Sequence, residues 1–247
     1  VTLRSSDSDI TVHNIFSYGG QALAAADGGG IKSTAGNGGD GGWVDLNGKT
    51  GVQADQIQAY GGAQSDGGQS SGKAGDGGQV LVIAGAGATS GAILTGAINT
   101  YGGASDSLAG GGGGLVRLSA TAGVQGSYIS AYGGGNQYAR GTGSQGGDAG
   151  DVSISSGSGA VSLQNVQAYG GRSTSNRGGD GGGISISSSG GGITATTLVS
   201  HGGQSTVARG GDGGDIRLHS NGDISLSQVW TFGSQGGAGG DLTLLAD

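Results

Sequence analysis

The residues of this chain that could do chemistry are aromatic or acidic, and both kinds recur at regular positions. An aromatic or imidazole ring precedes a glycine in each of seven similar segments. These residues are Tyr18, Tyr60, Tyr101, Tyr132, Tyr169, His201 and Phe232. Rings at equivalent positions of a repeat can stack on one another or hold a ligand between a flat face and a polar edge. We therefore predict an aromatic ladder, serving either for stacking or for ligand binding.

Aspartates form the second series. They lie four residues before an alternating apolar stretch, at Asp40, Asp76, Asp148, Asp180 and Asp212, while Gly112 and Ala238 take this position in two other repeats. Carboxylates stacked at strand spacing repel each other, and calcium could bridge them. The alternative is that each Asp accepts a backbone N–H at a glycine turn. Both interpretations stay open, so we expect no cofactor, with calcium as the alternative.

Little else in the chain points to catalysis. The histidines are His13, His201 and His219, and no Ser-His-Asp set follows from their spacing. Arg117 and Arg217 occupy equivalent positions in distant repeats and are expected to be solvated. Glycine-rich near-matches to phosphate loops and nucleophile elbows lack the strand and helix that such motifs need. We predict that the chain is not an enzyme.

The elements that position these residues follow from an apolar pattern of constant spacing. Three residues before each ring lies an aliphatic residue: Ile15, Ile57, Ile98, Ile129, Val166, Leu198 or Val229. Five residues before that lies another: Ile10, Val52, Ile93, Val124, Val161, Ile193 or Ile224. Constant spacing marks packed structure, whereas the variable length after each ring marks a loop. The pattern therefore indicates a repeat protein.

A further alternating stretch precedes each block, such as Val44–Leu46 or Val152–Ile154, so each repeat is expected to contain three short strands and a glycine-rich loop. Helix is not expected, because 65 of 247 residues are glycine and every acidic residue is Asp. Stacking equivalent strands gives each one a partner. We predict an all-β, right-handed parallel β-helix (β-solenoid) of about seven three-strand coils, forming a single domain over residues 1–247.

The aromatic ladder has two possible positions in this fold. Two residues after each aliphatic the side chain is small, as at Ala59 and Ala131, and residues two apart share a face of a strand. The small residue should therefore point inward and the ring outward, where the glycine-rich loops would cover it in extended or polyproline-II-like form. If the chain bends between aliphatic and ring, the rings are interior instead.

Composition excludes some partners. The net charge of -7 and the ten scattered Lys and Arg residues disfavour nucleic acid. No apolar run approaches the roughly 20 residues of a membrane span. The chain lacks cysteine and does not begin with Met, which fits a processed or excised piece of a secreted protein.

Stretches such as "GGDGGDIRLHSNGDISLS" resemble the large repetitive surface proteins of bacteria, the filamentous-haemagglutinin-like adhesins and autotransporter passengers. The resemblance implies a right-handed β-helix, exported to the cell surface for adhesion or matrix building. We therefore expect an extracellular or cell-surface structural protein, a segment or subunit of a filament that self-associates head to tail. The alternative is an adhesin or carbohydrate-binding passenger that contacts surface glycans through its tyrosine column.

Overall fold

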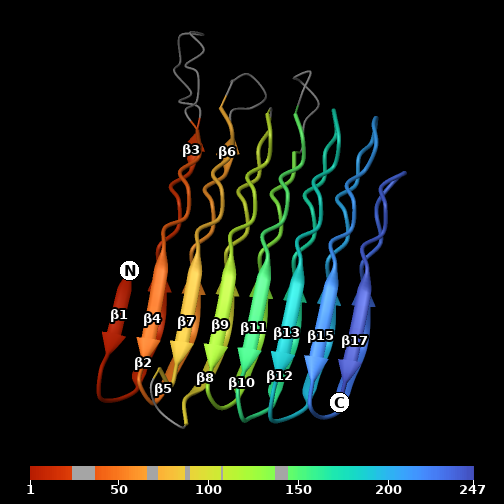
Figure 1. Cartoon of the computed structure of the whole chain (residues 1–247). Coiled ribbons are helices and arrows are strands. Elements are labelled where there is room, and N and C mark those ends of the chain that lie inside the picture. The colour runs from red at the N-terminus through yellow and green to blue at the C-terminus, as the bar shows by residue number, and fades with distance from the viewer. Residues whose placement is uncertain (24–36, 66–71, 87–89, 107, 137–143) are drawn as a thin grey trace.

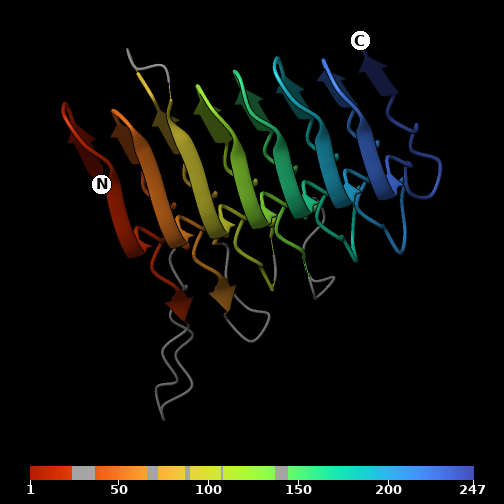
Figure 2. The same cartoon turned by 90° about the horizontal axis from the view of Figure 1, so that it is seen from below.

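All regular structure in this protein is β-strand. The computed structural model describes residues 1–23, 37–65, 72–86, 90–106, 108–136 and 144–247, and these contain no helix, as predicted. Two parallel sheets, called sheet A and sheet B here, contain eight and seven strands, and they run side by side along the whole molecule (Figures 1 and 2). The described residues accordingly include no helix that could cross a membrane.

Apart from two short strands of a third sheet, successive strands alternate between sheets A and B, so each of the seven repeats contributes one strand to each, and Leu242–Ala246 adds the eighth strand of sheet A. Sheet A consists of β1 (Thr2–Ser5), β4 (Val44–Gly48), β7 (Val80–Ala84), β9 (Val116–Ala120), β11 (Val152–Ser156), β13 (Ile184–Ser188), β15 (Ile216–Ser220) and β17 (Leu242–Ala246). Sheet B consists of β2 (Ile10–Phe16), β5 (Gly51–Gln58), β8 (Ala92–Asn99), β10 (Val124–Ser130), β12 (Val161–Gln167), β14 (Ile193–Val199) and β16 (Ile224–Trp230). A small third sheet pairs β3 (Ala22–Leu23) with β6 (Gln64–Ser65).

Equivalent residues of neighbouring repeats pair directly, as the constant spacing predicts. In sheet A, Val152 pairs with Ile184 and Ile154 with Ile186. These side chains are buried, whereas Ser153 and Ser155 between them are partly exposed on the outer face. This alternation is the signature of a strand with one buried face. The same inward columns of Val, Ile and Leu run from repeat to repeat.

The prediction of three strands per repeat is wrong in one respect. The two aliphatic positions that precede each ring were expected on separate strands, but they lie on one continuous strand of sheet B. Ile10 and Ile15 are both buried although they lie five positions apart, an odd offset that would place them on opposite faces of a regular strand. Pairing in β2 runs from Ile10 to Val12, skips one residue, and resumes at Asn14. The skipped residue and its successor both point outward, which restores the inward direction at Ile15. A local irregularity thus bends the strand without ending it.

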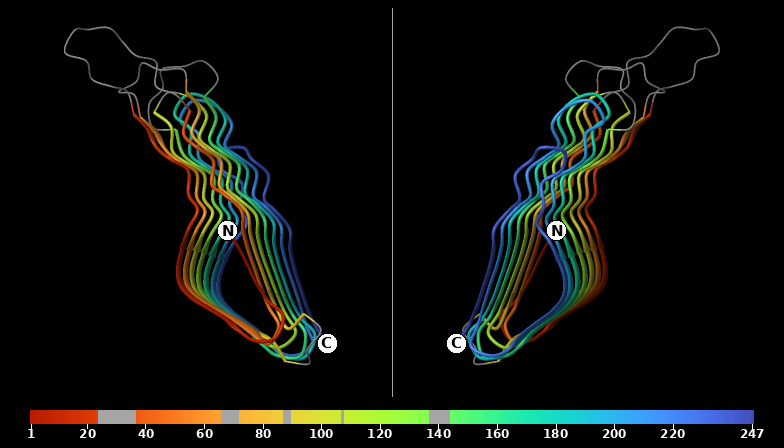
Figure 3. Two further views of the ribbon diagram at one scale, coloured as in Figure 1. Left: turned by 90° about the vertical axis from the view of Figure 1, so that its left-hand side faces the viewer. Right: turned by 90° about the vertical axis from the view of Figure 1, so that its right-hand side faces the viewer.

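The two sheets face each other and share one hydrophobic core. Side chains from the inner faces of both sheets form a single cluster of buried residues. Figure 3, viewed along the stack, shows the two sheets bowed apart and joined at one end by short connections, while the glycine-rich loops extend from the other end as a narrow bundle. The molecule therefore has two regions of different construction.

The glycine-rich loops form a backbone ladder in which hydrogen bonds recur every three residues. In the limb that leaves sheet B, the Gly61 and Gln64 N–H groups donate to the next repeat (2.9 Å each), whereas the Gly62 N–H donates to Gly39 of a returning limb (2.8 Å). The Gly75 N–H of the returning limb donates in turn to the Gly62 carbonyl (2.9 Å). A period of three along a limb is that of polyproline II chains, one of the two forms that the sequence analysis left open.

This interleaving needs glycine because the limbs approach backbone to backbone. A Cβ at Gly62 would overlap the carbonyl oxygen of Gly20, and a Cβ at Gly103 would overlap the carbonyl oxygen of Gly62. No side chain larger than hydrogen fits between such limbs. The high glycine content therefore has a packing cause in the loops that the structure describes.

Candidate functional site

The candidate site is the aromatic ladder, which lies where sheet B continues into the glycine-rich loops. Beyond β5 the chain stays extended, so Ala59 points into the core and Tyr60 points outward. The equivalent Thr100, Ala131 and Ala168 are also fully buried. The rings lie outside the cluster of buried core residues, which agrees with the outward direction predicted from the sequence and not with the interior one.

All seven rings stack in one column. Centroid distances between neighbours range from 4.8 Å for Tyr60–Tyr101 and Tyr132–Tyr169 to 5.1 Å for Tyr169–His201. Neighbouring tyrosine rings are parallel to within 6°. The column continues from His201 to Phe232 at 4.9 Å. This separation is the strand spacing of the sheets, so the sheets set the distance between rings.

The stacking determines which parts of each ring a ligand could reach. A ring inside the column has both faces covered by its neighbours. Only the edges and hydroxyl groups of Tyr60, Tyr101, Tyr132 and Tyr169 therefore face outward. The end rings Tyr18 and Phe232 have one neighbour each in the column, and they are 51% and 53% exposed.

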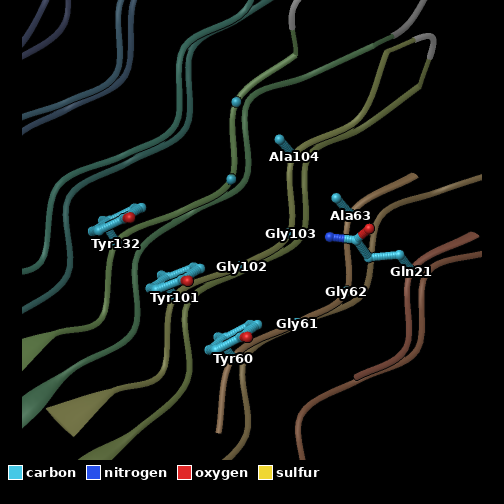
Figure 4. Close-up of a pocket in the computed structure, with 12 residues that line it drawn as sticks. Gln21, Tyr60, Gly61, Gly62, Ala63, Tyr101, Gly102, Gly103, Ala104 and Tyr132 are labelled. Atoms are coloured by element: carbon cyan, nitrogen blue, oxygen red, sulfur yellow. The ribbon is translucent and has the colours of Figure 1, made fainter. Parts of the chain in front are cut away.

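A shallow groove of about 330 Å³ runs beside the ladder. Tyr60, Tyr101 and Tyr132 line one side, and the Gly61–Gly62 and Gly102–Gly103 pairs of the outgoing limbs form much of the remainder. Figure 4 shows the three rings in parallel, each attached at the start of a glycine limb, with Ala63, Ala104 and Gln21 farther along the limbs. The groove crosses several repeats and gives the ring edges access to water.

Partial burial widens the pH range over which the four inner tyrosines of the ladder stay protonated. Burial raises the pKa of Tyr60, Tyr101, Tyr132 and Tyr169 above the ordinary value of a phenol, and the charge that a neighbouring tyrosine would carry raises it further. Four tyrosines in contact cannot all ionise without like-charge repulsion. At neutral pH the ladder therefore presents a row of neutral hydroxyl groups.

The predicted aspartate column exists, and its carboxylates bind backbone amides of the next repeat. The Asp76 N–H donates to the Asp40 carboxylate (2.8 Å), and the Gly112 N–H donates to Asp76 (2.7 Å). Asp148, Asp180 and Asp212 repeat the arrangement farther along: each accepts the N–H of the equivalent residue one repeat on. The predicted amide bond is thus present, but the donor belongs to the neighbouring repeat and not to the same turn.

Basic side chains neutralise part of this column, a feature that the sequence analysis missed. Lys73 pairs with Asp76 (3.0 Å), and Arg177 bridges Asp180 (2.6 Å) and Asp212 (3.1 Å). Arg209 adds a second cation at Asp212. Each of these bases precedes its nearer Asp by three residues, and this spacing is the signal that could have revealed the pairs.

The described residues contain no side-chain arrangement that supports the metal or catalytic sites considered from the sequence. This part of the chain contains no group of three or more His, Asp or Glu side chains arranged to hold a metal ion. His13 and His219 lie apart on outer faces, each against one aspartate, Asp55 and Asp247 respectively. Arg217 is exposed and pairs with Asp215 (2.6 Å). Calcium binding along the aspartate column stays a prediction.

Sequence reasoning also missed two aromatic residues beside the ends of the ladder. Phe16 and Trp230 occupy the same column of sheet B, in which the intervening repeats have Gln58, Asn99, Ser130, Gln167 and Val199. Phe16 contacts Tyr18 edge to face, with ring centroids 6.2 Å apart, and Trp230 lies 6.5 Å from Phe232. The signal that could have revealed them is their position: each directly follows the aliphatic residue, Ile15 or Val229, that lies three residues before a ladder ring.

No protein-family model, curated protein or solved structure matches this chain. The candidate site therefore has to be interpreted from its own geometry.

Proposed function

We propose that this chain is a segment or subunit of an extracellular structural rod, built from right-handed parallel β-helix coils that stack along one axis. The alternation of strands between sheets A and B supports a coiled path. Parallel crossover connections of this kind are right-handed in nearly all proteins. A rod of this type transmits load through backbone hydrogen bonds that run along its length.

The observation that carries the proposal is the contrast between equivalent columns in the middle and at the ends of the stack. Ile216 and Leu218 are 0% and 1% exposed, whereas Leu242 and Leu244, one repeat later in the same columns, are 47% and 48% exposed. At the other end Val1 and Leu3 are exposed as well. A further coil on either end, from the same chain or from a second copy, would bury these side chains and pair the open strand edges.

The aromatic residues support the same conclusion. Most large exposed hydrophobic side chains of the described residues lie at the two ends; the others are Leu94, Leu115 and Val207. Phe232 at one end and Tyr18 at the other are members of one column, so a head-to-tail contact would continue the ladder. Trp230 and Phe16 would meet in the adjacent column. An exposed apolar patch of this kind marks an interaction surface.

The extracellular assignment has compositional support. The chain contains no cysteine, is acidic, and resembles repetitive bacterial surface proteins along its length. Strength in such a protein comes from stacked backbone bonds, which need no disulfide and no helix. The composition agrees with this construction, because the chain has no cysteine for disulfides and its high glycine content disfavours helix.

Elongation of the purified chain tests the proposal. We expect rods in electron micrographs and a concentration-dependent increase in sedimentation at neutral pH. Leu244→Lys places a charge on the apolar end of the inward column and should suppress elongation. Thr243→Lys, the adjacent residue on the outer face of β17, is the matched control and should elongate normally. A chain that stays monomeric at high concentration, or equal loss in both variants, would argue against end-to-end stacking.

The alternative function, a glycan-binding adhesin, keeps less support. Sugar rings commonly bind by stacking on an open aromatic face, and the faces of Tyr60, Tyr101, Tyr132 and Tyr169 are covered by neighbouring rings. Among the seven rings of the ladder, only Tyr18 and Phe232 offer an open face. Adhesin activity therefore stays a prediction, and glycan-dependent quenching of tyrosine fluorescence by the monomer is the result that would favour it.

A further inference from the structure

The tyrosine part of the ladder joins residues that are distant in sequence but in direct ring contact. Tyr18, Tyr60, Tyr101, Tyr132 and Tyr169 form four consecutive contacts, each at 4.8 or 4.9 Å between centroids. Every contact connects two different repeats. The ring edges open on the groove beside Tyr60, Tyr101 and Tyr132, which is open to solvent and has a volume of about 330 Å³.

We propose that this ladder is a site of oxidative cross-linking, at which a haem peroxidase and hydrogen peroxide join neighbouring tyrosines through dityrosine bonds. The proposal goes beyond the structural role of the rod, because it assigns a covalent modification to specific side chains. Its basis is the geometry of the column: phenol rings are already in contact in the folded state, so no rearrangement of the backbone is needed to bring partners together.

The chemistry balances without any further reactant. Each of two phenols loses one electron and one proton, and the resulting radicals couple through the carbon atoms next to their hydroxyl-bearing carbons. One carbon–carbon bond forms, and each coupled carbon loses its hydrogen as the ring recovers its aromatic hydroxyl form. The peroxide receives the two electrons and two protons and becomes two water molecules. The neutral hydroxyl groups release their protons to water in the groove.

The ladder also sets where the reaction stops. His201 and Phe232 continue the column beyond Tyr169 but have no phenol, so the coupling partners end at Tyr169. Each bond would tie one repeat to the next and restrict the unfolded chain, as a disulfide does. The cross-linked rod should therefore resist denaturant better than the untreated one.

Two variants with equal numbers of ladder tyrosines test the proposal. Both have Tyr128→Phe as background, because the Tyr128 phenol lies near enough to Tyr132 and Tyr169 for its charge to raise their pKa. The adjacent variant adds Tyr18→Phe and Tyr169→Phe, which leaves three neighbouring tyrosines. The alternating variant adds Tyr60→Phe and Tyr132→Phe, which separates every remaining pair by a phenylalanine. Phenylalanine preserves the stacking in both.

The dilute protein is treated with peroxidase and peroxide, and dityrosine is measured by fluorescence and located by mass spectrometry of peptides. The adjacent variant should form intrachain bonds between ladder neighbours, and the alternating variant should form on the order of tenfold fewer. Equal yields in the two variants, or no dityrosine in the adjacent one, would overturn the proposal. Peptide mapping of the unsubstituted protein gives an independent result: cross-links confined to tyrosines outside the ladder would also overturn it.

Discussion

The two-sheet core and the glycine-rich loops both stack equivalent segments of successive repeats, but they are stabilised in opposite ways. In the core, a layer of Val, Ile and Leu side chains separates the two sheets, and apolar burial stabilises the stack. In the loops, limbs contact each other directly through backbone hydrogen bonds, with almost no side chain between them. The core therefore depends on the side chains that are present, whereas the loops depend on side chains that are absent. The aromatic ladder lies at the boundary between the two regions.

Removing volume should damage the core most. Ile98 is fully buried in β8, so Ile98→Ala should lower the free energy of unfolding by about 2–5 kcal/mol. Leu94→Ala, in the same strand but 42% exposed, should cost less than about 1 kcal/mol. Denaturation by guanidinium measures both values, and similar losses would contradict the assignment of the inner face.

Adding volume should damage the loops. Gly103→Ala brings a Cβ against the Gly62 carbonyl and should cost about 1–3 kcal/mol. Gly112→Ala is the matched control, because its Cβ would approach no atom closer than 3.6 Å. We expect it to be neutral or stabilising by up to about 1 kcal/mol. If both changes are equally tolerated, the interleaved limbs are not the packed structure described here.

High pH should destabilise the aromatic ladder, which lies at the boundary between the two regions. The folded state raises the pKa of Tyr101, Tyr132 and Tyr169, so their contribution to stability is complete below the unfolded value of about 10. It is lost as the pH rises through the higher folded-state values. Thermal melting followed between about pH 8 and pH 12, together with phenolate absorbance, should show a falling midpoint. Tyr132→Phe should reduce that fall, and an unchanged slope would contradict the cause.

Removing one polar group from the core should have a smaller effect, and this effect should be a gain in stability. The Thr95 hydroxyl is buried without a hydrogen-bond partner in the described structure. Thr95→Val keeps the side-chain shape and should raise the free energy of unfolding by about 1 kcal/mol. Thr194→Val on the exposed face of β14 should change it by less than about 0.5 kcal/mol. A loss of stability in Thr95→Val would mean that this hydroxyl has a partner.

The smallest effect concerns the aspartate column. Backbone amides and the Lys73, Arg177 and Arg209 side chains already contact its carboxylates. We therefore expect EDTA to leave the melting temperature and the assembly of rods unchanged. A lower melting temperature that calcium restores would instead establish the calcium-bridged column.

Much of the fold follows from the sequence because repeats make one-dimensional spacing equivalent to three-dimensional stacking. The aliphatic columns, the ladder and the aspartate column were all predictable from residue positions. The continuity of the sheet B strand was not, since an odd spacing such as Ile10 to Ile15 suits either a break or a local irregularity. The ion pair between Arg177 and Asp212 was not predictable either, because its partners lie in different repeats.

By itself, the sequence determined which residues lie above one another: a constant number of residues between aliphatic, small and aromatic positions leaves one register in which every apolar column is buried. Only the tertiary structure decided how the glycine limbs interleave and which amide each aspartate accepts. Those bonds join backbone groups of different repeats. Glycine has no side chain, so no pattern of polar and apolar residues in the sequence indicates which limb it pairs with. Side-chain chemistry encodes burial, whereas backbone pairing between limbs depends on how closely they can approach.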